Sequence, residues 1–390
     1  MGYYDVGMAS TPTDLRHSLT ADVALVWAGT VSCGFQILRP GMVGAMIDDL
    51  ALSPDRVGFI CALQLTCSGI ATIVLLAMGQ VTARAILALG ILGLGLADLA
   101  GAVCHSAMGL AVWQALGGLS SGAAFTVSTA RASRSIRSGV LFAGFGAAQA
   151  AFGIAGYAAL PWVLRAGGCA SALALLGALA LTALPGLVGL APICAPAGPR
   201  SRLLPPRTQR TLLLSAAVAG MSYTGAGAYV ERIGLRTGLS HTVVSVSLAI
   251  SMIGCLSGAL YALYAGARDR PGRLLSLGLR VLLLSLALLL LPTSAPVYCA
   301  ALLGLAACPM LLVPAYLGSL NQIERDPGAP VRGLIAVSAG MAAGPAIAGE
   351  LISAAGYPAF VATAVGSAVL AMLLAATAIG RRRQQLATPV

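Results

Sequence analysis

Long apolar stretches recur along almost the whole chain, and short segments rich in arginine, glycine and proline separate them. A hydrocarbon layer about 30 Å thick is crossed by a helix of roughly 20 mostly apolar residues. The pattern therefore predicts an all-α integral membrane protein with twelve transmembrane helices. The first six are predicted at 22–47, 56–79, 85–104, 107–130, 139–164 and 169–191. The second six are predicted at 210–230, 241–264, 273–292, 295–320, 332–354 and 357–379.

One polar interruption is longer than the others and divides these helices into six plus six. It runs from Ala195 to Gln209 and holds four prolines and three arginines, so it cannot form an apolar helix. We interpret it as a linker between two bundles. The predicted organisation is an N-terminal segment (1–21), a six-helix bundle (22–191), a linker (192–209), a second six-helix bundle (210–379) and a basic tail (380–390).

The two halves also share short sequence matches at similar offsets. Ala51-Leu52-Ser53 before the second predicted helix corresponds to Gly238-Leu239-Ser240 before the eighth, 187 residues later. Gly144, Gln149 and Gly153 in the fifth helix correspond to Gly340, Pro345 and Gly349 in the eleventh, 196 residues later. Such repeats are typical of transporters in which the binding site lies between two related halves.

The distribution of basic residues predicts the orientation in the membrane. All 23 basic residues are arginines, and an even number of spans places both termini on one side. If that side is the cytoplasm, 18 arginines face inward and four, at positions 56, 165, 232 and 236, face outward. This asymmetry follows the positive-inside rule. We therefore predict a multi-pass protein of the cytoplasmic (inner) membrane with both termini in the cytoplasm.

Composition excludes several classes of function. Hydrophobic residues make up 58% of the chain and charged residues 9%, with a mean hydropathy of +0.91, which no soluble domain could bury. The net charge of +11 is spread over short loops, so anionic lipid headgroups, and not nucleic acid, are the expected partners. Three scattered histidines and the absence of a phosphate-binding loop argue against an enzyme, a metal site or a nucleotide cofactor. We expect a monomer without cofactors.

The segment from Gly266 to Arg273, which reads GARDRPGR, resembles the signature loop of the major facilitator superfamily. That signature, G-x-x-x-D-R-x-G-R-R/K, lies between the second and third helices and is often repeated between the eighth and ninth. The earlier copy in this chain keeps only Gly79 and Arg84. The resemblance implies two six-helix bundles and a cytoplasmic gate, for which it names Arg84, Asp269, Arg270, Gly272 and Arg273.

Two other positions depart from the drug antiporters of that superfamily. Those proteins usually carry an R-x-x-x-G pattern in the fourth helix and a Gly-Pro pair in the fifth. Here the corresponding residues are Trp113 to Gly117 and the pair Ala148-Gln149. A drug antiporter of the usual kind is therefore disfavoured, although export of a solute is compatible with the sequence.

Polar residues at helical spacing indicate which helices line a pathway. Ser32, Gln36 and Arg39 are spaced so that they form a polar stripe along one side of the first helix. Gln64 begins a similar stripe in the second helix, and Gln114 begins one in the fourth. The predicted substrate-binding residues are Gln36, Arg39, Gln64, Gln114, Gln149 and Tyr223. The alternative is that such residues only pack helices together, or that Arg39 extends its charge to the membrane surface.

Three carboxyl groups inside predicted helices are candidates for proton coupling: Glu231, Asp98 and Glu350. An ionisable side chain in a bilayer is costly unless it is paired or faces water, so it indicates function by default. The alternative for Glu231 and Glu350 is that they lie at the outer interface between membrane and water. The alternative for Asp98 is that it forms a structural pair with another residue.

Together these features predict a secondary active transporter that moves a small organic solute by alternating access, with protons as the favoured co-ion. Arg39 favours a solute with an acidic group. An efflux carrier for hydrophobic drugs or metabolites is the alternative, and a solute sensor that does not transport is a remote one.

Overall fold

The computed structural model describes residues 12–78, 83–104, 106–135, 137–190, 207–266, 271–291, 294–323 and 329–387, which are helical and contain no strand. The first seven helices are α1 (Pro12–Ser32), α2 (Gly34–Asp49), α3 (Pro54–Met78), α4 (Arg84–Ala102), α5 (Ala107–Ser133), α6 (Ser138–Leu181) and α7 (Leu184–Leu187). The remainder are α8 (Arg207–Arg236), α9 (His241–Gly266), α10 (Pro271–Leu288), α11 (Ala295–Ile323) and α12 (Ala329–Ala387). Nine helical segments in these ranges are long and apolar enough to cross a membrane.

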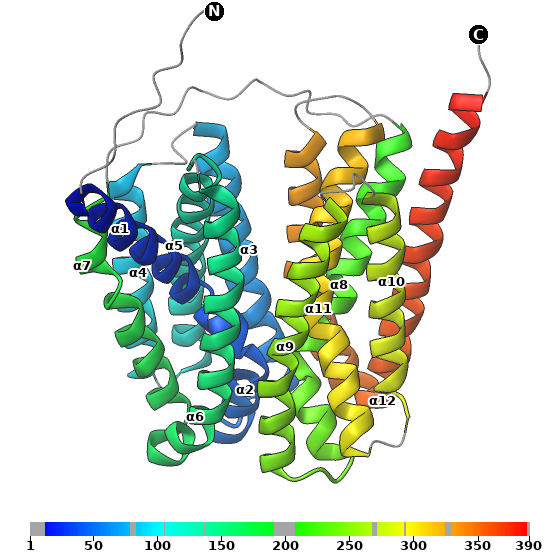
Figure 1. The fold of residues 1–390 in the computed structure, drawn as a ribbon. Helices are drawn as coiled ribbons and strands as arrows, with labels where there is room; N and C mark the ends of the chain where they lie inside the picture. Colours follow the sequence, from blue (N-terminus) through cyan, green and yellow to red (C-terminus); the bar gives the residue numbers. More distant parts are fainter. Residues whose placement is uncertain are drawn as a thin grey trace, which may run out of the picture.

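The helices form two groups that stand side by side (Figure 1). Helices α1 to α7 make up one group and α8 to α12 the other. The two groups stand with their helices roughly parallel, so they share two ends. One end is the level at which α8 begins, at residue 207. The opposite end is the level at which α2 ends and α3 begins, at residues 49–54. We call the first the linker end and the second the distal end.

Glycines allow two of the long helices to reverse direction at the distal end. Helix α6 contains a kink at Gly167 and Gly168, and Gly168 has a φ of +62° that other residues rarely adopt. Helix α12 has a kink at Gly356, with a φ of +81°. After the first kink, the Cys169 N–H donates a hydrogen bond of 2.7 Å to Asp49 Oδ2. Both kinks fall at turns predicted from the sequence, between 164 and 169 and between 354 and 357.

The first predicted helix is not continuous, which corrects the expectation for 22–47. Helix α1 ends at Ser32 and α2 begins at Gly34. At the break, the Cys33 N–H donates to the Thr30 carbonyl at 3.0 Å, a bond to the residue three positions earlier that tightens the turn. The predicted stripe of Ser32, Gln36 and Arg39 is therefore divided, and only Gln36 and Arg39 share α2.

Close helix contacts inside each group depend on residues without side chains. A Cβ on Gly118 of α5 would overlap the Gln64 carbonyl of α3, and a Cβ on Gly340 of α12 would overlap the Ala217 carbonyl of α8. Such contacts let the backbones approach closely, as is common between membrane helices. Gly366, further along α12, has no atom within 4 Å of a built Cβ.

This difference yields a prediction for stability. We expect Gly340→Ala to destabilise the protein by about 1–3 kcal/mol, because the new methyl group must push α8 away from α12. Gly366→Ala is the matched control in the same helix and should leave stability nearly unchanged or slightly improved, since both changes alter helix propensity equally. Thermal unfolding of the purified variants in detergent checks this, and equal melting temperatures for the two would contradict the packing argument.

Candidate functional site

Helices α2 and α8 face each other across the two groups and set the register of the interface. The Glu231 carboxylate of α8 lies against Gly44 of α2, with Oε2 2.9 Å from where a Cβ would stand. Asp48, one turn further along α2, forms an ion pair of 2.5 Å with Arg232. Both helices run toward the distal end. The register therefore places Arg39 of α2 near the level of Gly227 of α8.

Arg39 is a buried cation with no carboxylate partner among the residues that the structure describes. It is 6% exposed, and its Nε atom has no hydrogen-bond partner. No carboxylate of the described residues lies within ion-pair distance of Arg39, which includes Glu231, Glu350 and Asp98. Pro40 follows it inside α2 and lacks a backbone N–H. A buried guanidinium in this state is expected to have a partner that the chain itself does not supply.

One side of α8 leaves open space at Gly227. Tyr223, Gly227 and Glu231 follow one another at intervals of four residues, so they share one side of the helix. A Cβ built on Gly227 has no atom within 4 Å, whereas Glu231 touches α2. Arg39 is also close enough to Tyr223 and to Tyr157 of α6 to interact with them electrostatically. Gly227 therefore leaves open space on the side of α8 that also carries Tyr223 and Glu231.

Tyr157 holds α2 in place beside this space. Its hydroxyl donates a hydrogen bond of 2.6 Å to the Ile37 carbonyl, two residues before Arg39. A Cβ on Gly153, one turn before Tyr157, would meet both Ile37 of α2 and Met252 of α9. This part of α6 therefore contacts both groups of helices, and Gln149, half-buried, lies one turn earlier on the same side.

The glutamines predicted to bind substrate are divided between two environments. Gln36 is half-buried on α2. Gln64 and Gln114 are 2% and 1% exposed, and Gln64 Oε1 and both amide atoms of Gln114 have no partner. Gln64 lies one turn from Cys61, which is within electrostatic range of Arg39. Gln114 is instead buried on α5, inside the first group of helices.

The three predicted proton-coupling carboxyls also separate. Glu231 is half-buried between α2 and α8, and its Oε2 atom has no hydrogen-bond partner. Asp98 is 4% exposed and lies inside the first group, where its Oδ1 atom approaches Gly117 of α5. Glu350 is exposed on α12. Of the three, only Glu231 is shown to contact the opposite group of helices. Among the described residues, no three His, Cys, Asp or Glu side chains gather as metal ligands.

Of the predicted gating residues, the structure describes Arg84, Gly272 and Arg273, which lie at the linker end. Arg84 begins α4, and its guanidinium donates a hydrogen bond of 2.8 Å to the Val188 carbonyl of its own group. Gly272 and Arg273 belong to the first turn of α10. Asp269 and Arg270 lie outside the described residues. The gating role of all five stays a prediction.

At the distal end, four polar contacts between described residues join the two groups. The Arg232 guanidinium pairs with Asp48 at 2.5 Å and also donates to the Gly44 carbonyl. The Tyr229 hydroxyl donates to the Pro54 carbonyl at 2.5 Å. The Ser353 hydroxyl donates to Asp55 Oδ1 at 3.1 Å. We call this set of residues the distal latch.

The distal latch was not predicted from the sequence, although the arginine distribution placed Arg232 on the outer side. The available signal was the pairing of equivalent helices. Asp48 and Arg232 lie at corresponding ends of the first and seventh predicted helices and have opposite charges. In a protein with two related halves, opposite charges at equivalent positions are candidates for a contact across the interface.

Comparisons with known proteins identify the fold. No family model matches the sequence, and no curated protein does. A crystal structure of the nucleoside transporter NupG superposes with a TM-score of 0.70 at 12% identity, covering 94% of this chain and 98% of the other. A crystal structure of a mutant form of NupG gives a TM-score of 0.69 at 12% identity over 93% and 99%. The chain therefore shares its overall fold with these transporter structures.

Proposed function

We propose that this protein is a secondary active transporter that moves a small solute across the cytoplasmic membrane by alternating access. On this proposal, twelve helices cross the membrane as two bundles, 22–191 and 210–379, and both termini are cytoplasmic. The linker end then faces the cytoplasm and the distal end faces outward. This orientation agrees with the arginine distribution, 18 against four.

The observation that carries the proposal is the unpaired Arg39 beside open space at the interface of the two groups. Its guanidinium is buried, lacks a carboxylate partner among the described residues and lies, by the register of α2 and α8, near the level of Gly227, where a built Cβ meets open space. A guanidinium presents a planar fork that matches a carboxylate or phosphate group. The proposed solute therefore carries at least one acidic group, and we propose that Tyr223 and Gln64 contact the rest of it.

The distal latch supports alternation between two states. Its four contacts hold the groups together at one end, while the solute must enter and leave from both sides. Opening outward requires these contacts to break, which makes the latch a gate of the kind that rocking bundles use. Glu231 lies between the latch and the Arg39 site, so we propose that its protonation couples the gate to a proton gradient.

Flux into proteoliposomes tests the proposed function. Purified protein would be reconstituted and supplied with a panel of labelled mono- and dicarboxylates, phosphorylated metabolites and nucleosides, the last because of the NupG likeness. Each solute is measured with and without an inward proton gradient. We expect saturable uptake of at least one acidic solute, faster with the gradient. Uptake of nucleosides alone would contradict the proposal that the solute carries an acidic group, but it would support the proposal that the protein is a transporter.

Two alternatives have distinct outcomes in the same assay. An efflux carrier would move its solute out of vesicles when the gradient is reversed, and hydrophobic dyes added to the panel would reveal it. A sensor would bind a solute, as measured by a shift in melting temperature, and move none.

A further inference from the structure

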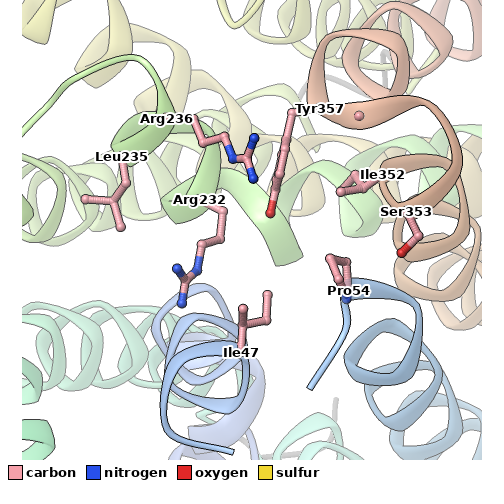
Figure 2. A pocket seen from close by; sticks show the side chains of 9 residues that line it. Ile47, Pro54, Arg232, Leu235, Arg236, Ile352, Ser353 and Tyr357 are labelled. Atoms are coloured by element: carbon pink, nitrogen blue, oxygen red, sulfur yellow. The ribbon is translucent and has the colours of Figure 1, made fainter. Parts of the chain in front are cut away.

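A pocket of about 480 Å³ lies at the distal end, directly beside the latch. Four helices from both groups line it: α2 with Ile47, α3 with Pro54, α8 with Arg232, Leu235 and Arg236, and α12 with Ile352, Ser353, Gly356 and Tyr357. Figure 2 shows the Arg236 guanidinium beside the Tyr357 ring and Arg232 extending from α8 toward Ile47. The pocket is separate from the Arg39 site, which is about two turns deeper along α2.

The charges around this pocket favour an anion. Arg236 lies over Tyr357, with its Cζ atom 4.9 Å from the ring centre, and has no carboxylate within ion-pair distance among the described residues. Arg232 retains one donor without a partner, since its Nε atom is buried and makes no hydrogen bond. Of the neighbouring carboxylates, Asp48 is engaged by Arg232 and Asp55 by Ser353, whereas Glu231, which precedes Arg232 on α8, touches α2 at Gly44.

The arrangement offers more donors than acceptors. Each guanidinium has five N–H groups in a fixed plane, and an anion with two or more oxygens can bind such groups in pairs. The Ser353 hydroxyl is already donated to Asp55, so the two guanidinium groups are the donors that face the pocket, and Ile47, Leu235 and Ile352 supply apolar walls. The ring of Tyr357 fixes the Arg236 side chain, which lowers the entropy lost when an anion binds.

We propose that this distal pocket binds a small oxyanion, a carboxylate or phosphate group, and that the anion competes with Asp48 for Arg232. Arg232 is shared between the pocket and the latch, so binding at the first weakens the second. The anion thereby favours separation of the two groups at the distal end. The group is supplied either by a dissolved anion or by the headgroup of an acidic phospholipid.

Binding is tested on the purified full-length protein in detergent, with inorganic phosphate and citrate as probes and calorimetry as the readout. We expect saturable binding that Arg236→Gln weakens about tenfold or more, because one charged donor pair is lost. Arg165→Gln is the matched control, since Arg165 is exposed and lies over Trp162 at the same 4.9 Å outside this pocket. No binding, or equal loss in both variants, would overturn the proposal.

Competition with Asp48 is tested by a second pair of variants. Asp48→Asn should bind the probe more tightly than wild type, because Arg232 is released from its ion pair. Asp49→Asn removes the same charge one residue away, where the side chain accepts from Cys169, and should have a smaller effect. In wild type, the probe should also raise deuterium uptake in residues 44–56, the segment held by the latch. Equal affinity changes in the two variants, or unchanged uptake, would reject the competition.

Lipid composition distinguishes the two sources of the anion. In nanodiscs of phosphatidylcholine, a dissolved anion should still raise deuterium uptake in residues 44–56. If the occupant is a headgroup, phosphatidylglycerol alone should produce that rise and added phosphate should add nothing. All of these readouts are made without transport, so their failure would leave the proposed carrier function standing, and a failed flux assay would leave this site standing.

Discussion

Replacing Glu231 by Gln is expected to release transport from the proton gradient while leaving the fold intact. The Glu231 carboxylate lies against Gly44 and Gly41 of the opposite group, and its Oε2 atom is buried without a hydrogen-bond partner. A charged carboxylate is costly in such a place, and it gains water when the two groups separate. Gln has the same shape but cannot exchange a proton, so the step that links opening to protonation is lost.

The measurement is uptake in proteoliposomes at several internal and external pH values. Wild-type uptake should accelerate with an inward proton gradient, and Glu231→Gln should show one slower rate that the gradient does not change. Glu350→Gln is the comparison, because that carboxyl is exposed on α12 and should leave the pH dependence as it is. If Glu231→Gln keeps the wild-type pH dependence, then Glu231 serves only to fill the space beside Gly44.

Glu231 and Glu350 also illustrate what sequence can and cannot predict at this site. Both lie near the outer ends of predicted helices, and hydropathy treats them alike. The two residues differ in whether the side of the helix that carries them faces another helix. That orientation depends on long-range packing. Gly44 of α2 makes room for the Glu231 carboxylate, whereas Glu350 is exposed on α12. The sequence does not indicate this difference. The residue type was predictable, and its surroundings were not.

The helices themselves were predictable because the bilayer imposes a simple rule. A membrane helix must satisfy its own backbone hydrogen bonds and present apolar side chains, so long apolar stretches predict it directly. Turns such as those at Gly168 and Gly356 follow from the same rule with glycine as the marker. The break between Ser32 and Gly34 does not, because a single tightened turn at Cys33 costs little and leaves no compositional trace.

The distal latch was predictable in part, less than the helices and more than the surroundings of Glu231. Its residues are ordinary in composition, and a carboxylate, an arginine and a tyrosine near helix ends are common at membrane surfaces. The contact of Asp48 with Arg232 becomes predictable only after the halves are recognised as related and α2 is matched with α8. Contacts to backbone carbonyls, such as Tyr229 to Pro54, have no such signal, since every residue carries a carbonyl.

Arg39→Lys is expected to have the largest effect of any conservative change in this protein on solute transport. The variant keeps the positive charge and most of the side-chain length, so burial and folding change little. It loses the planar fork that binds two oxygens of one anionic group at once. We expect apparent affinity for an acidic solute to fall about tenfold or more, the equivalent of one lost charged hydrogen bond.

The control for this change is Arg280→Lys, because Arg280 is exposed on α10 and far along the chain from the interface. It should transport as wild type does. Arg39→Gln removes the charge altogether and should abolish saturable uptake of the acidic solute. Its protein yield and melting temperature should stay near wild type or rise, since an unpaired buried charge is replaced by a neutral amide.

The competing explanation is that Arg39 extends its charge toward the membrane surface and has no part in binding. Its 6% exposure and its partnerless Nε atom argue against that, because a side chain at the surface reaches water or headgroups. The two explanations differ in Arg39→Gln. A surface role predicts normal apparent affinity with reduced insertion or yield, whereas the proposed binding role predicts normal yield with lost affinity. Normal affinity in that variant would remove the basis for an acidic solute, and the search would then move to Tyr223 and Gln64.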